Sequence, residues 1–424
     1  MLSLLLVAAV LGADPAPIQL FSGKDLSHWT PVNVTPETFT VKDEMIYCTG
    51  KPTGLLRTNE MFENYVLELD WKHLEKQGNA GLFVWSDGLP AVGVPFSRAI
   101  EVQIMVGSEA DWYTCDGDIF PIWGAKMTPD HPRTINGTLT DRSYPTSKTT
   151  KPTDWNHYKV VCNNGTIELS INGVVVNSAK NVSPRNGYIC LESEGTPVQF
   201  KNITLTPLPS SNAAAEASDA NGWTQLFAGD FRDWNFTSAH EGHFVASGNN
   251  IVFDGKGEDL WSKKSYKNFE LVCDWRWTGK GETAERPVVN PDGSNAVDEQ
   301  GKPKTATVTD AGDSGIYLRG SSKSQVNIWC WPVGSGEVYG YRTDNAQNEK
   351  VRAGVTPKVA ADKPIGQWNR FHITMKGKKL SVKLNDKQVL EDALLPDVDA
   401  AGPIALQKHD GAIEFTNIFV RELP

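Results

Sequence analysis

The chain has 424 residues, which is more than one ordinary hydrophobic core can organise and favours two or three domains. Its 37 glycines, 25 prolines and 39% hydrophobic content are typical of a folded, turn-rich chain with many short strands. Asp and Glu (51) outnumber Lys and Arg (41), and a net charge of -10 without any basic run argues against a nucleic-acid partner.

Residues 1–13 have the features of a signal peptide. The apolar run from Met1 to Leu11 has the length of a signal-peptide core, and Gly12-Ala13 offers a small-residue cleavage point. No Lys or Arg precedes the run, so a chance apolar start is the alternative interpretation. No other stretch approaches the length of a membrane span. We therefore predict an extracytoplasmic protein, periplasmic or secreted, without a transmembrane segment in the mature chain.

The rest of the chain repeats itself. Matching segments occur in the same order in both halves: 19–23 and 225–229, 64–72 and 268–276, 79–84 and 313–318, and 155–158 and 368–371. Apolar side chains alternate with period two in 64–72 and in 268–276, which indicates strands. We predict two tandem domains, residues 17–207 and 223–424, joined by a flexible linker of small polar residues at 208–222.

Each domain is expected to be an antiparallel sandwich or jelly roll. Asn164-Gly165 lies between two alternating apolar runs, which is a strong hairpin signal, and an equivalent turn lies near Gly377. No amphipathic helix longer than two turns is evident, so the predicted class is all-β. The two copies differ in insertions at 103–155 and at 279–309, which belong in surface loops.

The six cysteines include no CxxC pair, and no histidine stands at ligand spacing, so zinc is not indicated. Several sit in apolar strand positions, where cysteine acts as a small buried hydrophobe. Disulfides are possible in an exported chain, but the sequence favours no particular pairing.

Several motifs together resemble the 3-keto-disaccharide hydrolase family. They are LFSGKDLSHW at 20–29, GLLRT at 54–58, NAGLF at 79–83, IEVQI at 100–104, DSGIYLR at 313–319 and GPIALQKHDG at 402–411. The resemblance covers both halves and implies two concanavalin A-like jelly rolls in tandem.

The resemblance also implies a substrate in which the C3 hydroxyl of a sugar has been oxidised to a ketone. The ketone makes the C2 proton acidic, so a base can remove it and the C1 glycosidic oxygen can leave by elimination. Water can then add, which gives net hydrolysis. Such a site needs a base near C2, a hydrogen-bond donor or cation at the C3 oxyanion and an acid near the leaving oxygen.

The resemblance carries Arg319, Gln407 and His409 over as catalytic candidates in the second domain. An imidazole titrates near neutral pH and suits proton transfer, and a guanidinium suits an enolate oxygen. The alternatives are that His409 is a structural loop histidine and that Arg319 pairs with a carboxylate such as Glu337.

Substrate-binding candidates come from both domains, because neither holds the whole family set. Glu192 and Glu194 share a strand face at a separation that suits paired acid and base carboxylates, although exposed carboxylates are the alternative. A solvated face is likewise the alternative for the Glu-x-Gln pair of the first domain. The full set is Glu101, Gln103, Trp85, Glu192, Glu194, Gln325 and Asn327.

Tryptophans near loops could stack on sugars, whereas buried sandwich tryptophans are the ordinary alternative. The candidates are Trp85, Trp112, Trp123, Trp329 and Trp331. Asp310 and Asp313 are weak candidates for a divalent metal such as calcium, because two carboxylates at a turn need no metal. No other cofactor is predicted.

These observations predict an exported, carbohydrate-active protein that cleaves 3-keto-glycosides by base-assisted elimination or hydrolysis. Its ligand would be a glycan or a small saccharide. One alternative is a non-catalytic carbohydrate-binding protein with two lectin-like domains. Another is an interaction module of a larger surface assembly.

Overall fold

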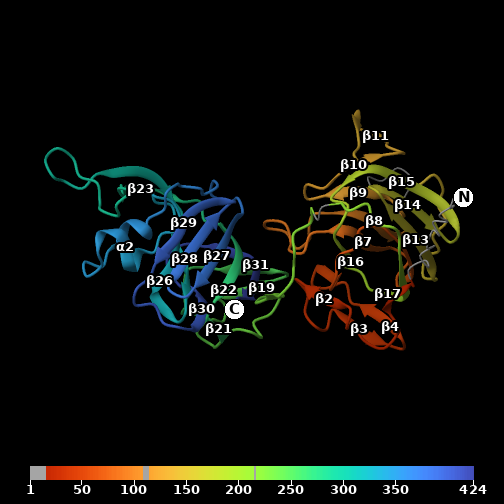
Figure 1. The fold of residues 1–424 in the computed structure, drawn as a ribbon, viewed down its shortest axis with the longest axis horizontal. Coiled ribbons are helices and arrows are strands. Elements are labelled where there is room, and N and C mark those ends of the chain that lie inside the picture. Colours follow the sequence, from red (N-terminus) through yellow and green to blue (C-terminus); the bar gives the residue numbers. More distant parts are fainter. Residues whose placement is uncertain (1–15, 108–113, 214–215) are drawn as a thin grey trace, which may run out of the picture.

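The computed structural model describes residues 16–107, 114–213 and 216–424, and nearly all of its elements are strands (Figure 1). The predicted signal peptide and Trp112 lie outside the described residues. Only two helices occur in the described part, α1 (Tyr339–Arg342) and α2 (Glu349–Gly354). This confirms the all-β prediction. In the described ranges no helix is long and apolar enough to cross a membrane.

The first copy is a two-layer sandwich. Its large sheet has the order β10-β15-β14-β13-β6-β17-β4-β3, and β1 also pairs with β17. The strands are β1 (Ile18–Phe21), β3 (Phe39–Lys42), β4 (Met45–Cys48), β6 (Tyr65–His73), β10 (Lys126–Pro129), β13 (Asn156–Asn163), β14 (Thr166–Ile171), β15 (Val174–Ser183) and β17 (Val198–Pro207).

The small sheet of the first copy has six strands in the order β2-β5-β16-β7-β8-β9. They are β2 (Trp29–Val32), β5 (Gly54–Thr58), β7 (Gly78–Ser86), β8 (Ala99–Val106), β9 (Ile119–Ile122) and β16 (Tyr188–Ser193). A separate short hairpin pairs β11 (Thr134–Ile135) with β12 (Thr138–Leu139).

The large sheet of the second copy has the order β19-β20-β31-β22-β27-β28-β29, and β18 pairs with β31. These strands are β18 (Trp223–Gln225), β19 (Phe244–Ser247), β20 (Asn250–Phe253), β22 (Phe269–Trp277), β27 (Asn369–Lys376), β28 (Lys379–Leu384), β29 (Lys387–Leu394) and β31 (Ile413–Glu422).

The small sheet of the second copy has the order β21-β30-β25-β26. Its strands are β21 (Leu260–Tyr266), β25 (Asp313–Leu318), β26 (Ser321–Trp329) and β30 (Gly402–Leu406). A further hairpin of β23 (Glu282–Pro287) and β24 (Thr305–Asp310) carries the predicted insertion and projects away from the first copy (Figure 1).

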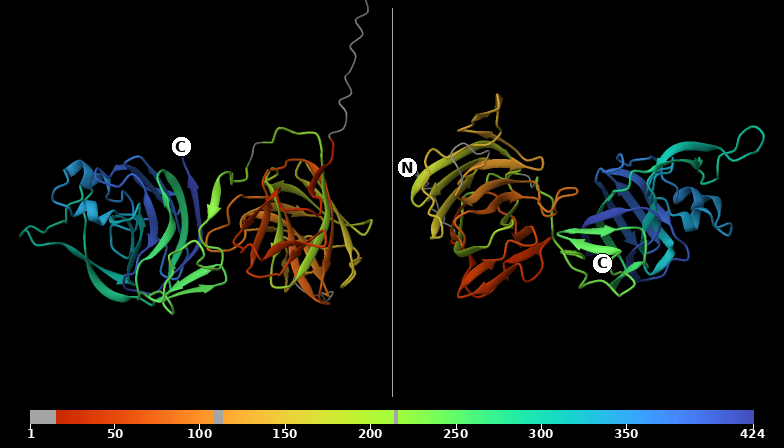
Figure 2. Two further views of the ribbon diagram at one scale, coloured as in Figure 1. Left: turned by 90° about the horizontal axis from the view of Figure 1, so that it is seen from below. Right: turned by 180° about the vertical axis from the view of Figure 1, so that it is seen from behind.

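The two copies share one topology. In the first, β6 is flanked by β13 and β17, and in the second, β22 is flanked by β27 and β31. The small sheets likewise place β16, β7 and β8 side by side in one copy and β30, β25 and β26 in the other. Alternate residues of β6 and β22 enter two separate hydrophobic cores, as the period-two pattern predicts. Two jelly-roll sandwiches therefore follow one another in the chain (Figure 2).

The copies also contact each other, through the loop at 87–98 of the first copy. The Gly93 N–H donates to Asp274 Oδ2 at 2.9 Å, and Asp274 is ion-paired with Arg370 at 2.6 Å. Arg370 donates to the Pro90 carbonyl at 2.9 Å. Apolar side chains of both copies pack beside these polar contacts, including Phe83, Tyr188, Val272 and Phe419. The outer face of the second copy's large sheet is thus joined to the first copy.

The described part of the linker is hydrogen-bonded to the first copy. The Ser211 N–H donates to Glu63 at 2.9 Å, the Ser218 N–H to Asp87 at 2.8 Å, and the Ala220 N–H to the Tyr188 hydroxyl at 3.0 Å. These bonds hold the segment on the surface of the first copy. The linker was predicted to be flexible because its small polar residues show no apolar period. Its backbone N–H groups instead bind it to the first copy.

Candidate functional site

A pocket of about 310 Å³ opens on the small sheet of the second copy. It brings together strands β25 and β26, the segment after β30 and α1. The lining residues are Asp313, Gln325, Asn327, Trp329, Trp331, Tyr339, Gln407 and His409. Four of the residues predicted for substrate or catalysis, Gln325, Asn327, Gln407 and His409, therefore meet in one cavity.

Strand alternation explains why these side chains meet. Ile316 in β25 and Val326 and Ile328 in β26 point into the core. Asp313, Gln325 and Asn327 therefore occupy positions whose side chains point to the opposite face. Pairing in register places Asp313 opposite Trp329 and Tyr317 opposite Gln325.

Asp313 is the acidic group of the pocket. Burial, the largest cause, together with the carboxylates Asp310 and Asp410, raises the pKa of Asp313 to about 6, although His409 and Arg286 favour its ionised form. At neutral pH the side chain is thus a carboxylate whose basicity exceeds that of an exposed aspartate. A group of this kind suits proton abstraction.

His409 shares the pocket with Asp313 and is half-exposed. Its Nδ1 accepts a hydrogen bond from the backbone N–H of Asp410 at 2.8 Å. A neutral imidazole with an accepting Nδ1 carries its hydrogen on Nε2. This arrangement leaves Nε2–H as a hydrogen-bond donor rather than a base.

The side-chain amides of Gln325 and Gln407 meet on the outer face of the small sheet, over Gly315. Gln325 Nε2 donates to Gln407 Oε1 and, at 3.1 Å, to the Ser314 carbonyl. A Cβ added at Gly315 would lie 2.2 Å from Gln325 Nε2, so only glycine leaves room for this pair. Asn327 is 3% exposed and its Oδ1 has no hydrogen-bond partner among the described residues. The floor of the pocket is therefore polar and uncharged, with an unused acceptor.

Aromatic rings form one wall. The Trp329 and Trp331 rings stack at 4.1 Å with an interplanar angle of 2°. Tyr339 meets both edge to face, at 6.0 Å and 6.3 Å. Flat indole faces beside carboxamides are suited to the C–H faces and hydroxyls of a sugar ring.

The structure does not bring Arg319 to this pocket, which corrects its expected role at an enolate oxygen. Arg319 is 2% exposed, and its guanidinium donates to the backbone carbonyls of Gly377 at 2.7 Å, Asp399 at 2.9 Å and Lys267. It does not pair with Glu337 either, because Glu337 is ion-paired with Arg342. Arg319 is a structural residue behind the sheet.

Trp85 is also structural. It is fully buried, its indole N–H donates to the Glu63 carbonyl at 2.7 Å, and its ring packs against Tyr65. The expected stacking of Trp85 on a sugar is thereby corrected. Trp123, in contrast, is 51% exposed.

Asp310 is engaged by protein donors, and the calcium role suggested for Asp310 and Asp313 stays a prediction. The Asp310 carboxylate is ion-paired with Arg286 and accepts the Gly312 N–H at 3.0 Å. Its oxygens are therefore taken up by protein donors. Within the described ranges no group of three or more His, Cys, Asp or Glu side chains is arranged to hold a metal ion.

The first copy carries a different residue set at the matching positions. Gly81 pairs with Gln103 and Phe83 with Glu101, as Gly315 pairs with Asn327 and Tyr317 with Gln325. Leu191 of β16 pairs with Leu82, so Glu192 is the counterpart of Gln407. An added Cβ at Gly81 would lie 2.7 Å from Glu101 Oε1 and 2.8 Å from Glu192 Oε2. A carboxyl pair thus replaces the carboxamide pair.

Glu101 and Glu192 of the first copy are buried, which rules out the alternative of a solvated face for them. Burial and the surrounding carboxylates raise the pKa of Glu101 and Glu192 well above the ordinary value. Burial also raises the pKa of Glu194, which accepts a hydrogen bond from Asn79 Nδ2. The pair is therefore protonated over a pH range in which exposed glutamates are ionised.

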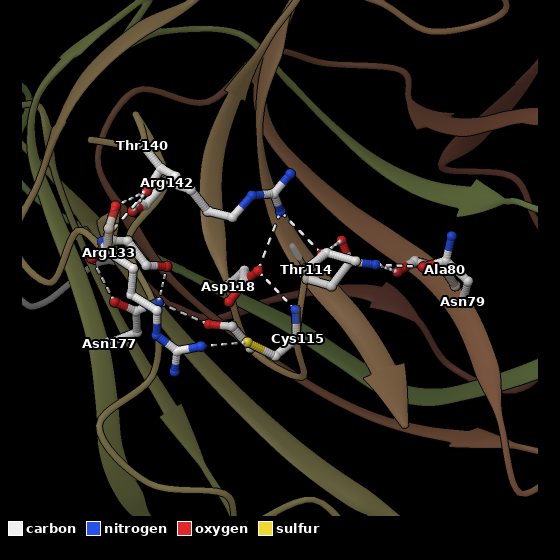
Figure 3. A network of polar contacts seen from close by, with 12 residues as sticks. Asn79, Ala80, Thr114, Cys115, Asp118, Arg133, Thr140, Arg142 and Asn177 are labelled. Carbon is white, nitrogen blue, oxygen red and sulfur yellow. Dashed lines mark hydrogen bonds and ion pairs between the residues drawn. The ribbon is translucent and has the colours of Figure 1, made fainter. Parts of the chain in front are cut away.

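A polar network extends from Asn79 across the first copy (Figure 3). Gln103 Nε2 donates to Asn79 Oδ1 at 2.5 Å, and Thr114 donates to Gln103 at 3.3 Å. Arg142 donates to Thr114 at 3.1 Å and is ion-paired with buried Asp118 at 3.3 Å. Gln103 is thereby fixed by a neighbour on β7 and by one in the connection before β9.

The sequence interpretation missed the role of Asp313 and the contribution of Tyr339. Asp313 is the first residue of β25 and of the DSGIYLR motif, so its place in that motif was a usable signal. Tyr339 follows a Gly-rich turn with no periodic pattern, and no sequence signal placed it in the pocket.

The fold and the site define a protein of two jelly-roll sandwiches, each with polar side chains on the outer face of its small sheet. The model of the 3-keto-alpha-glucoside-1,2-lyase-like domain matches residues 16–206 and 222–421. The chain belongs to this family and contains two copies of its domain. No protein of curated function matches it.

Three solved structures each match a stretch of this chain about as long as one copy. A Parabacteroides distasonis protein described as a glycosyl hydrolase is 20% identical over 46% of this chain and 94% of its own, with a TM-score of 0.35. The carbohydrate-binding module CBM66 of Bacillus subtilis is 13% identical over 42% and 94%, with a TM-score of 0.30. The Bacillus licheniformis beta-glucanase is 11% identical over 47% and 100%, also with 0.30.

Proposed function

We propose that the second copy cleaves 3-keto-glucosides by elimination, with Asp313 as the base and His409 as the donor to the enolate oxygen. The observation that carries this proposal is the shared pocket of Asp313 and His409. Family membership supports the substrate class, because the family is named for a 3-keto-alpha-glucoside lyase.

The first step is removal of the C2 proton. The Asp313 carboxylate takes this proton, and the electrons of the C2–H bond move into the C3 ketone to give an enolate. With its pKa near 6, Asp313 is ionised at neutral pH and still basic enough to contribute.

The enolate oxygen then needs a donor. The Nε2–H of neutral His409 supplies it, because Nδ1 is occupied by the Asp410 N–H. A neutral donor placed where negative charge develops stabilises the transition state more than the ground state.

Collapse of the enolate completes the reaction. The C1–C2 double bond forms, the bond from C1 to the glycosidic oxygen breaks, and the leaving oxygen takes a proton from water on the opposite face of the ring, while protonated Asp313 releases its proton to solvent. The products are an unsaturated 3-keto sugar and an alcohol, and Asp313 is again a carboxylate. Addition of water to the unsaturated ketone gives net hydrolysis.

The first copy supports binding without this chemistry. Asn79 stands where Asp313 stands, and Glu194 replaces His409. The partly exposed Glu194 can hydrogen-bond to a sugar hydroxyl, but the aspartate and imidazole pair is missing there. We propose that the first copy is a saccharide-binding domain.

The test is incubation of the full chain with ethyl 3-keto-α-glucoside and with unoxidised ethyl α-glucoside. We expect ethanol release and the ultraviolet absorbance of an unsaturated ketone from the oxidised substrate only. Saturable binding of both compounds without release would favour the non-catalytic alternative.

A further inference from the structure

A second, larger cavity adjoins the polar pocket of the second copy. Its volume is about 730 Å³, which is within the range of small-molecule sites. It lies between the end of β22, hairpin strand β24 and the loop at 360–365. Its walls include Trp275, Trp277, Val308 and Ile365.

The two cavities share a wall. Trp329 and Trp331 line both of them, and their rings are stacked in parallel. A molecule whose sugar ring occupies the polar pocket can therefore extend past this indole pair into the larger cavity. The group that enters would be the one attached to the glycosidic oxygen.

The chemistry of the larger cavity differs from that of the polar pocket. Four indole rings line it, and Trp275 and Trp277 also belong to the hydrophobic core. The charged residues Lys280, Asp362 and Lys363 also line it. All three are exposed, and the Asp362 carboxylate already accepts a hydrogen bond from the Ser335 N–H at 2.9 Å. A second sugar would bury several hydroxyls against apolar walls, and each hydroxyl without a partner is costly. An apolar ring gains from the same burial.

We infer that the larger cavity binds an apolar, ring-bearing aglycone, so that the preferred substrates are glucosides of hydrophobic alcohols rather than disaccharides. This inference rests on the proposed function, since it assumes that the sugar occupies the polar pocket. It assigns to Ile365 and Val308 a role in specificity, because both line the aglycone cavity and neither lines the polar pocket.

The experiment compares 2-phenylethyl and ethyl 3-keto-α-glucoside as substrates of the full chain. Both leaving groups are unactivated primary alcohols, so a difference in kcat/KM reports on binding of the phenyl ring. We expect roughly a tenfold or greater preference for the phenylethyl compound, which is the size expected for filling an apolar pocket. Ile365→Arg should abolish the preference and leave kcat/KM for the ethyl compound within about twofold of wild type.

Val308→Arg is a second variant in case Ile365→Arg fails to fold, and Val359→Arg is the matched control. Val359 is 38% exposed and does not line the cavity. Equal kcat/KM for the two substrates, or a preference that survives in both cavity variants, would overturn the aglycone inference and leave the proposed function standing. Failure to cleave either compound would instead overturn the proposed function and the inference with it.

Discussion

Trp85 and Arg319 occupy the same position in the two copies and perform the same task. Trp85 lies near the end of β7 and Arg319 directly follows β25, and both have a left-handed backbone, at φ 52° and 51°. Trp85 donates to the Glu63 carbonyl, and Arg319 donates to the Lys267 carbonyl. Glu63 and Lys267 immediately precede the matching Asn residues that lead into β6 and β22. An indole and a guanidinium thus serve as interchangeable anchors for the same turn.

Removing the Arg319 anchor should affect folding rather than chemistry. Arg319→Ala leaves buried carbonyls without donors, and we expect a loss of roughly 2–4 kcal/mol in the free energy of unfolding. The kcat/KM per folded molecule should stay within about twofold of wild type, because Arg319 does not reach the pocket. Thermal denaturation and titrated active-site assays measure the two quantities.

The control for this variant is Arg232→Ala. Arg232 is exposed and ion-paired with Asp230, so its removal should cost less than about 1 kcal/mol. A stable Arg319→Ala protein without activity would contradict the structural role.

Asp313→Asn should remove the base. We expect kcat/KM on a 3-keto-glucoside to fall by roughly 10²- to 10⁴-fold. In the wild type, kcat/KM should fall about tenfold per pH unit below the pKa of Asp313, which is about 6, because the protonated acid cannot accept the C2 proton. Asp310→Asn is the neighbouring control, since Asp310 is held by Arg286. A pH profile that is flat between pH 5 and pH 8 would argue against Asp313.

His409→Ala tests the assignment of His409 to the enolate rather than to the leaving group. An enolate donor assists removal of the C2 proton, so its loss should slow exchange of the C2 hydrogen with D2O by roughly 10²- to 10³-fold. NMR of the substrate in D2O measures this exchange directly. Rapid exchange combined with lost alcohol release would instead assign His409 to protonation of the leaving oxygen.

The sequence predicted the strands well because alternation records the two-sided environment of a sheet. Leu67 and Leu271 fall on core faces in both copies as expected. The role that the resemblance implied for Arg319 was wrong, and alternation could not have corrected it. By alternation it would share a face with Tyr317, but its positive φ and the register shift after Tyr317 redirect the side chain into the interior. A single residue in the left-handed region is not visible in a hydrophobic pattern.

The candidate site was predicted in part. Motif order grouped Gln407 and His409, and strand pairing joined them to Gln325 and Asn327. The burial of Glu101 and Glu192 was missed, because it depends on Gly81 of the neighbouring strand leaving space for both carboxyls. Such a cross-strand dependence becomes apparent only once the register is known.

The first-copy carboxyl pair should make stability depend on pH. Glu101 and Glu192 have raised pKa values in the folded state, whereas unfolded glutamates ionise near pH 4.3. The stabilisation from a neutral pair is therefore complete below that pH and is lost as the pH rises towards the folded-state values. We expect the melting temperature of the first copy to fall between pH 5 and pH 8.

Glu101→Gln combined with Glu192→Gln would install the carboxamide pair of the second copy. This double variant should be more stable than wild type at pH 8, by at least about 1 kcal/mol, and less sensitive to pH. Glu168→Gln, at an exposed position of β14, is the control and should change neither property. Differential scanning calorimetry at the two pH values decides the matter, and a double variant destabilised at pH 8 would speak against a protonated pair.

The contact between the copies can be tested at Gly93. Its φ is 75°, and an added Cβ would lie 2.2 Å from Trp368 Cδ1, so Gly93→Ala adds a collision between the copies to the cost of a left-handed alanine. Gly173→Ala isolates the second cost, because Gly173 has φ 84° and no atom within 4 Å of the added Cβ. We expect roughly 1–2 kcal/mol for Gly173→Ala and a larger loss for Gly93→Ala. Because the collision falls on the interface and not in either core, Gly93→Ala should also separate the unfolding of the copies into two calorimetric transitions. Equal effects of the two substitutions would mean that the loop at 87–98 does not hold the copies together in solution.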